Sequence, residues 1–154
     1  MSHTQSLEIP VPNAVAGLHL LDRVDYQDAY CIDTRVERTP EQWMRTILEG
    51  APRWFQVAWP AILGTLAGLR FGPRSASDHV LGWKIVDDRP DAFVIGLESS
   101  RGLVVRLIAL APPGQAVFAT QLLLETSYAR RLWSVARPGH RYFAPYLLAR
   151  ASKS

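Results

Sequence analysis

Cysteine is almost missing from this sequence, and so is the thiol and metal chemistry that depends on it. The chain has 154 residues and one cysteine, Cys31, so no disulfide can form within it. The four histidines are scattered, and none has a second ligand three or four residues away, which argues against a zinc-type motif. We therefore expect no metal site, no cofactor and a buried structural role for Cys31.

Motifs for nucleotide binding and for covalent catalysis are absent as well. Neither G-x-G-x-x-G nor a phosphate loop ending in Gly-Lys-Ser/Thr occurs, and there is no G-x-S-x-G turn for a nucleophilic serine. The sequence therefore names no reaction.

Lysine is scarce. Lys84 and Lys153 are the only two, and the net charge of +3 comes from arginines spread over the whole length. Nucleic-acid binding would require clustered basic residues among exposed aromatic side chains. The nearest approach is on the last segment, which we interpret as the solvated face of a helix, so we expect no nucleic-acid partner: Arg130, Arg131, Arg137, Arg141 and Arg150.

A membrane-spanning segment is not expected either. The uncharged stretch 54–69 contains Pro60 and two glycines and falls short of the roughly twenty residues that a spanning helix needs. The first thirty residues do not show a cationic start followed by an apolar core and a cleavage site. With a single cysteine, a reducing cytoplasmic location is the natural expectation.

What is present describes an ordinary globular interior, with 48% hydrophobic residues and five tryptophans. A chain of this length most often forms one domain. Pro10, Pro12 and Gly17 without sustained periodicity predict a loosely held arm over residues 1–17. The domain itself is expected over residues 18–152.

The first elements of the domain are a strand and two helices. Alternation predicts a strand over 25–35. Thr39 and Gln42 form a capping box around Pro40 and predict a helix that ends at Gly50. A second helix is expected over 52–68, with a kink at Pro60 and one face formed by residues at helical spacing: Trp54, Val57, Ala58, Ile62, Leu66 and Leu69.

From residue 80 the period becomes alternating, and turn signals predict an antiparallel meander with strands at 81–86, 92–98, 103–111 and 115–126. Alternation predicts which of its residues face inward: Trp83, Ile85, Phe93, Ile95, Leu97, Leu103, Val105, Leu107, Ala109, Ala116, Phe118, Leu122 and Leu124.

The opposite face of the meander is also rather apolar, which leaves room for a partner there. The last segment, 128–151, predicts a helix capped by Ser127, which Pro138-Gly139 and Pro145 kink or break. Its apolar face is expected to comprise Leu132, Trp133, Ala136, His140, Phe143 and Leu147.

The order strand, two helices, meander and long C-terminal helix is that of the α+β helix-grip fold. The chain also resembles the DUF2867 family, an uncharacterised bacterial branch of the START-like (SRPBCC) superfamily. The resemblance spans most of residues 19–151 and rests on three segments: Asp25-Tyr26-Gln27-Asp28-Ala29-Tyr30, Ala51-Pro52-Arg53-Trp54 and Pro138-Gly139-His140-Arg141. It implies a curved antiparallel sheet around the C-terminal helix, with a cavity between them, and it implies no reaction.

Three functions follow as hypotheses. The first is binding of a small hydrophobic ligand between sheet and C-terminal helix. The second is a polyketide cyclase or dehydratase-like enzyme with His140 or Asp28 as base, and the third is a homodimeric interaction protein. A one-residue error of face would let Asp28 and Arg106 pair in the interior. The candidate cavity residues are Asp28, Tyr30, Trp54, Trp83, Arg106, Phe118, Trp133 and His140.

Overall fold

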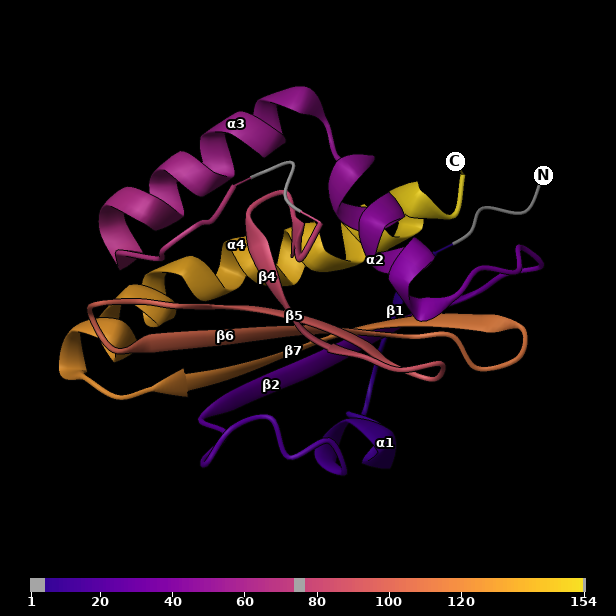
Figure 1. Ribbon diagram of the computed structural model, residues 1–154, viewed down its shortest axis with the longest axis horizontal. Coiled ribbons are helices and arrows are strands. Elements are labelled where there is room, and N and C mark those ends of the chain that lie inside the picture. Colours follow the sequence, from indigo (N-terminus) through magenta and orange to yellow (C-terminus); the bar gives the residue numbers. More distant parts are fainter. Residues whose placement is uncertain (1–4, 74–76, 154) are drawn as a thin grey trace.

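A curved antiparallel sheet with a helical layer on one face forms the α+β architecture of the computed structural model, which describes residues 5–73 and 77–153 (Figure 1). The long C-terminal helix crosses the sheet, as expected. The elements in chain order are β1 (Leu7–Ile9), α1 (Asn13–Ala16), β2 (Tyr26–Asp33), α2 (Pro40–Glu49), α3 (Arg53–Ile62), η1 (Leu63–Ala67), β3 (His79–Val80), β4 (Trp83–Asp88), β5 (Phe93–Glu98), β6 (Leu103–Leu110), β7 (Gln115–Leu124) and α4 (Ser127–Ala151).

The strands lie in the order β1-β2-β7-β6-β5-β4-β3, and every neighbouring pair is antiparallel. The four meander strands and the strand near residue 26 are confirmed. Two short edge strands, β1 and β3, were not predicted. Their three and two residues are too few to show a period, and pairing with a neighbour defines them.

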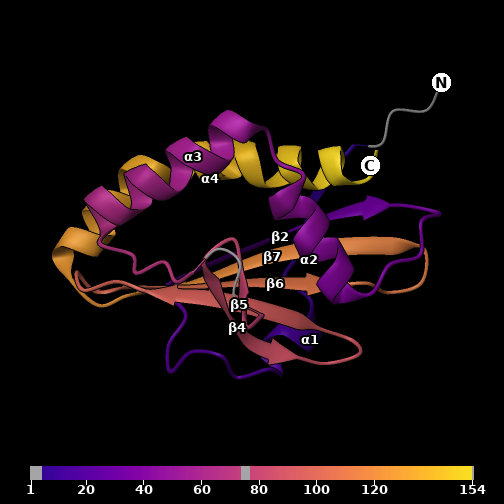
Figure 2. The same cartoon turned by 45° about the horizontal axis from the view of Figure 1, so that its top comes forward.

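The inner face of the sheet carries the main core. All of the meander residues predicted to face inward belong to this cluster or pack against it, which confirms the alternation. The helices α2, α3 and α4 supply the opposite wall, as Figures 1 and 2 show. The sheet therefore has one face whose side chains all point toward the helical layer.

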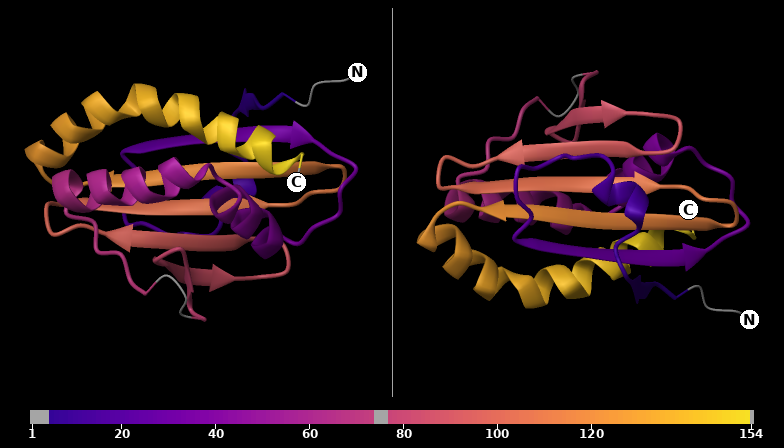
Figure 3. Two further views of the ribbon diagram at one scale, coloured as in Figure 1. Left: turned by 90° about the horizontal axis from the view of Figure 1, so that it is seen from above. Right: turned by 90° about the horizontal axis from the view of Figure 1, so that it is seen from below.

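The outer face of the sheet is covered by the N-terminal segment of the same chain (Figure 3, right). Val15 of α1 is fully buried there, and Ile9, Val11, Leu18 and Leu20 pack around it. Residues 7–16 are thus held against the sheet and do not form a loose arm. Their apolar side chains occupy the face where we expected room for a partner, because burying that face within the chain removes it from water.

Helix α2 begins as the capping box predicted. The Thr39 side chain accepts a hydrogen bond from the Gln42 backbone, and the Gln42 side chain accepts one from the Thr39 backbone. Helix α3 continues through Pro60 into η1, a π-helical turn. Its predicted face was wrong by about one residue, because Trp54 and Val57 are exposed whereas Phe55 is buried.

Helix α4 is continuous through Pro138, Gly139 and Pro145, and it bows along the sheet without breaking (Figure 3, left). Its cap is Thr126, whose hydroxyl accepts from the Ala129 backbone, one residue earlier than predicted. The predicted apolar face of this helix is turned toward the sheet and lines or borders its interior: Leu132, Trp133, Ala136, His140, Phe143 and Leu147.

Candidate functional site

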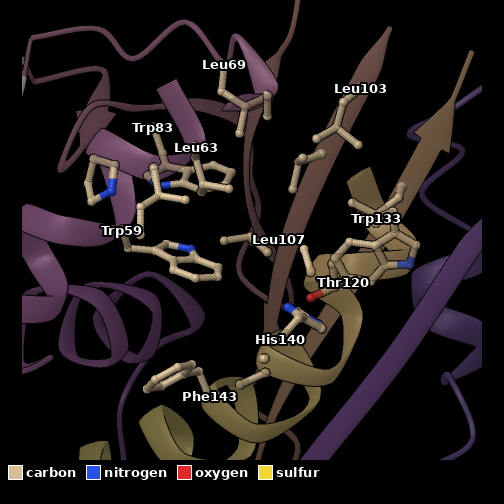
Figure 4. A pocket seen from close by; sticks show the side chains of 18 of the residues that line it. Trp59, Leu63, Leu69, Trp83, Leu103, Leu107, Thr120, Trp133, His140 and Phe143 are labelled. Atoms are coloured by element: carbon tan, nitrogen blue, oxygen red, sulfur yellow. The ribbon is translucent and has the colours of Figure 1, made fainter. Parts of the chain in front are cut away.

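A cavity of about 400 Å³ lies between the inner face of the sheet and the helices α3, η1 and α4 (Figure 4). This volume falls in the range that small-molecule sites occupy. Nearly all of the lining is hydrocarbon. The strands contribute Trp83, Leu103, Val105, Leu107, Phe118, Thr120 and Leu122, and the helical side contributes, among others, Phe55, Trp59, Leu63, Ala136, Gly139, His140 and Phe143.

The upper wall of the cavity is anchored at the end of η1. Gly68 follows it in the left-handed region at φ 66°, where a side chain would be strained, and the chain then forms the bridge Leu69 to Ser99. Arg101 donates to the carbonyls of Thr65 and Leu66 at 3.1 and 2.6 Å.

Further donors reach the same turn. The hydroxyl of Tyr128 donates to the Leu66 carbonyl, and the hydroxyl of Ser99 donates to the Ala67 carbonyl. These bonds satisfy carbonyls that a helix end leaves free. They hold α3 and η1 to the β5–β6 hairpin and to the start of α4, so the cavity has a fixed wall.

One side of the cavity carries a polar group, the imidazole of His140. Its Nε2 lies 3.1 Å from Oδ2 of Asp28, a carboxylate whose side chain is only 1% exposed. The hydroxyl of Tyr26 donates to the same oxygen at 2.6 Å, and Arg141 donates to the Tyr26 oxygen at 3.2 Å. A buried carboxylate with two donors is well satisfied, so Asp28 has a structural reason to stay where it is.

The contact with Asp28 indicates which ring nitrogen of His140 carries the proton. An ionised carboxylate only accepts, so Nε2 of His140 carries the proton that points to Asp28. In the neutral imidazole, Nδ1 is then an acceptor, and no partner for it is found within the described residues. Burial, followed by the bond to Asp28, raises the pKa of Tyr26 above its ordinary value, so its hydroxyl keeps its proton and donates.

Two more polar atoms at this wall have no partner in the described part of the chain. They are the hydroxyl of Thr120 and the indole Nε1 of Trp133, both from residues that line the cavity. Figure 4 shows Thr120 beside His140 at the cavity wall. The Trp133 ring meets His140 edge-on at 5.3 Å between centroids. The buried polar atoms of the lining that have no partner among the described residues therefore belong to residues beside His140, while the indole groups of Trp59 and Trp83 and the amide of Gln56 lie elsewhere in the lining.

Half of the predicted cavity residues line the cavity: Trp83, Phe118, Trp133 and His140. Asp28 lies behind His140 and does not line it. Tyr30 is buried in the core, also outside the lining, and burial raises its pKa to about 12. Trp54 is 59% exposed and does not line the cavity, so the prediction that it is a cavity residue was wrong.

Asp28 and Arg106 do not pair, and Arg106 does not line the cavity. Asp28 is opposite Thr120 in the sheet register, and Thr120 is opposite Leu107, so this row faces the helices. Arg106 belongs to the next row and lies on the outer face, 3.7 Å from Glu98. Side chains of neighbouring residues point to opposite faces, which keeps the two charges apart.

Thr120 was missed and Trp59 was not among the candidate cavity residues, although both carried a signal. Thr120 stands between Phe118 and Leu122 in the alternation of β7, so the same rule that placed those two residues inward places it inward. Trp59 is four residues after Phe55, the spacing of one helix face. Their rings stack at 5.5 Å, which turns both toward the interior.

The described residues also bear on metal binding and on membrane insertion. Within residues 5–73 and 77–153, no three side chains of His, Cys, Asp or Glu gather as metal ligands would. Of the helices described there, none combines the length and apolarity required to cross a bilayer. Comparison of the chain with family models, with curated proteins and with solved structures finds no match.

Proposed function

We propose that this protein binds a small, mostly apolar molecule in the cavity between the sheet and α3, η1 and α4. The observation that carries the proposal is a hydrocarbon-lined cavity of about 400 Å³ in which two buried polar atoms without a partner among the described residues, from Thr120 and Trp133, belong to residues beside His140. His140, Thr120 and Trp133 would hold the polar group of the ligand. The apolar lining would take the remainder.

The fold assignment belongs to the same proposal. We infer a helix-grip domain of the START-like type, related to the DUF2867 family. The order of elements, the curved antiparallel sheet and the long C-terminal helix support it. A ligand space between sheet and terminal helix is what this arrangement would provide. The third hypothesis, a homodimer, could use the outer sheet face or the exposed helix pair; residues 9–20 cover the first of these surfaces, and the second stays exposed.

The chemistry of the polar wall favours a neutral ligand with one hydroxyl or carbonyl group. The Nδ1 of a neutral His140 accepts, whereas the Thr120 hydroxyl both donates and accepts. A ligand carboxylate would enter an apolar space close to the ionised Asp28, which costs free energy unless His140 gains a proton.

The test is saturable binding of Nile red, a neutral apolar dye, together with native mass spectrometry of gently purified protein. Ala136→Phe places a ring into the cavity from α4 and should weaken dye binding at least about tenfold, because overfilled space excludes the ligand. Ala149→Phe, on the same helix but outside the lining, should bind like the parent. A protein that binds no dye and yields only the mass of the empty chain would contradict the proposal.

A second candidate function is proton abstraction at a carbon next to a carbonyl, in the manner of a cyclase or dehydratase. The His140–Asp28 pair favours it, since the carboxylate stabilises the imidazolium that forms when Nδ1 takes a proton. The measurement is deuterium exchange of the α-protons of a small cyclic β-diketone in D₂O. His140→Gln should abolish the acceleration by protein, and equal exchange with and without the parent protein would exclude the reaction.

A further inference from the structure

The charge of the molecule is divided unevenly between its layers. All 14 acidic residues lie outside α3, η1 and α4, because the sequence has no Asp or Glu over residues 50–77 or after Glu125. The same helices carry exposed arginines on their surface. These are Arg53 of α3 and Arg130, Arg131, Arg137 and Arg150 of α4, together with Arg141, which pairs with Glu8 of β1 at 2.6 Å.

Large apolar side chains are exposed among these arginines. Val135 is 81% exposed, Tyr142 66% and Trp54 59%. We call the exposed surface of α3, η1 and α4 the helical face; α3 and α4 lie side by side when the molecule is seen from above (Figure 3, left). Its apolar members are Trp54, Val57, Ile62, Leu66, Tyr128, Val135, Tyr142 and Tyr146.

Ring contacts join the two helices into one surface. Trp54 of α3 meets Phe143 of α4 at 6.0 Å between centroids, Phe143 meets Tyr142 at 5.2 Å, and Tyr142 stacks on Tyr146 at 6.3 Å. The exposed aromatic groups are therefore continuous across α3 and α4. Contiguous apolar surface of this kind marks a site of interaction.

The cavity reaches the surface on this face. Ile62, Leu66 and Val135 line the cavity, and each is also exposed to solvent. They come from α3, η1 and α4, the three elements of the helical face. A molecule that enters or leaves between these side chains crosses the helical face.

The positive charge of this face favours some binding partners over others. A second copy of the chain that met this face with its own would bring arginines against arginines, with no carboxylate from α3, η1 or α4 of either copy to pair them, which opposes association. Nucleic acid would leave Val57, Ile62, Leu66 and Val135 against phosphate and sugar without apolar contact. An anionic bilayer satisfies both features, because arginines meet lipid phosphates while Trp, Tyr and aliphatic groups enter the interface.

We propose that the helical face docks on the surface of an anionic phospholipid bilayer, with the mouth of the cavity turned toward the lipid. The protein lies on the membrane and does not cross it. Docking does not require the cavity to bind a ligand. Where both hold, an apolar molecule passes between bilayer and cavity without entering water.

The experiment is co-sedimentation with vesicles of phosphatidylcholine alone and of phosphatidylcholine with phosphatidylglycerol. We expect binding to the anionic vesicles at about 0.1 M salt and its loss at about 0.5 M, because salt screens the attraction. Arg131→Glu/Arg137→Glu should weaken binding about tenfold or more, since each basic residue at an anionic surface contributes several-fold.

The matched control changes the charge equally on other parts of the surface. Arg35 precedes α2 in a loop and Arg89 lies in the turn between β4 and β5, so Arg35→Glu/Arg89→Glu alters neither α3 nor α4. This variant should keep binding within about twofold of the parent apart from the general effect of net charge. Equal loss in both double variants would overturn the proposal, because binding would then follow net charge and not a face.

The contribution of the exposed apolar side chains to membrane binding is tested separately. Trp54→Ser should weaken vesicle binding several-fold and remove most of the quenching of tryptophan fluorescence by brominated lipid, because Trp54 is the most exposed tryptophan. Nile red binding in the charge variants shows that the cavity is intact. Failure to bind anionic vesicles at low salt, binding of RNA through the same arginines, or self-association through this face would each overturn the docking proposal and leave the ligand proposal standing.

Discussion

The two ends of the space between helices and sheet differ in how they are filled. At the filled end, α2 and the last turns of α4 bury Trp43, Met44, Ile47 and Leu148 at 1% exposure or less. At the hollow end, α3, η1 and the stretch 132–147 of α4 enclose the cavity. The same sheet supports both, so the filled end can supply stability while the hollow end keeps room for a ligand.

The largest expected effect tests the filled end. Trp43→Ala should lower the free energy of unfolding by about 3–5 kcal/mol, because it removes a fully buried ring and leaves a void. Trp59→Ala at the hollow end should cost at least about 1 kcal/mol less, since Trp59 lines an existing space. Urea unfolding measures both, and equal costs would remove the distinction between the ends.

The next effect concerns the polar wall. Asp28→Asn should lower stability by about 1–3 kcal/mol, because the amide oxygen can still accept from Tyr26 and His140 but lacks the negative charge that strengthens both hydrogen bonds. Asp33→Asn, at the exposed end of the same strand, serves as control and should change stability by less than about 0.5 kcal/mol. Similar values for both variants would mean that the His140 pair adds nothing.

A smaller effect of opposite sign is expected at Gly139. A Cβ built there has no atom within 4 Å, and the residue lies inside α4, so Gly139→Ala should raise stability by about 0.5–1 kcal/mol. Gly96→Ala is the contrasting variant, because its Cβ would lie 2.6 Å from the Arg106 guanidinium and 2.9 Å from a backbone carbonyl. Thermal unfolding should show a gain for the first and a loss for the second.

The smallest expected effect is a loss of stability at alkaline pH that depends on Tyr30. Burial raises the pKa of Tyr30 from 10.0 to about 12, so the folded protein favours the neutral phenol. The stability from this group is fully present below about pH 10 and is lost as pH rises through about 12.

Tyr30→Phe removes this dependence. It also deletes a buried hydroxyl without a partner among the described residues, so at neutral pH it should be neutral or stabilising by up to about 1 kcal/mol. Unfolding at several pH values, with tyrosinate absorbance as the probe, measures both effects. A destabilised Tyr30→Phe at neutral pH would show that the hydroxyl contributes to the core.

Much of the fold could be predicted because strands and helix caps produce recognisable patterns among residues that are close in the sequence. The alternation in Leu103, Val105 and Leu107 places each residue on the inner face, and the Thr39 capping box defines the start of α2. The edge strands β1 and β3 could not be predicted, since a strand of two or three residues depends on its neighbour. The same holds for the cover of the outer face by Val15.

The site was predicted in part. His140 and Trp133 lie on a helix face that periodicity defines, so they were found. Trp54 was misplaced because Trp54 and Phe55 both sit in an almost uncharged helix, where no polar side chain distinguishes the solvent side. That Asp28 supports His140 could not be seen, since 112 residues separate them and only the crossing of α4 over β2 brings them together.

The cover of the outer sheet face also has a consequence for the order in which the chain is made. Val15 leaves the ribosome early, yet its cluster includes Val117 and Ala119, which emerge far later. Until then, Val11 and Leu18, which pack against the same cluster, have no outer sheet face to pack against. Residues 9–20 therefore reach their final position only after strands synthesised about a hundred residues later have formed the outer face that they cover.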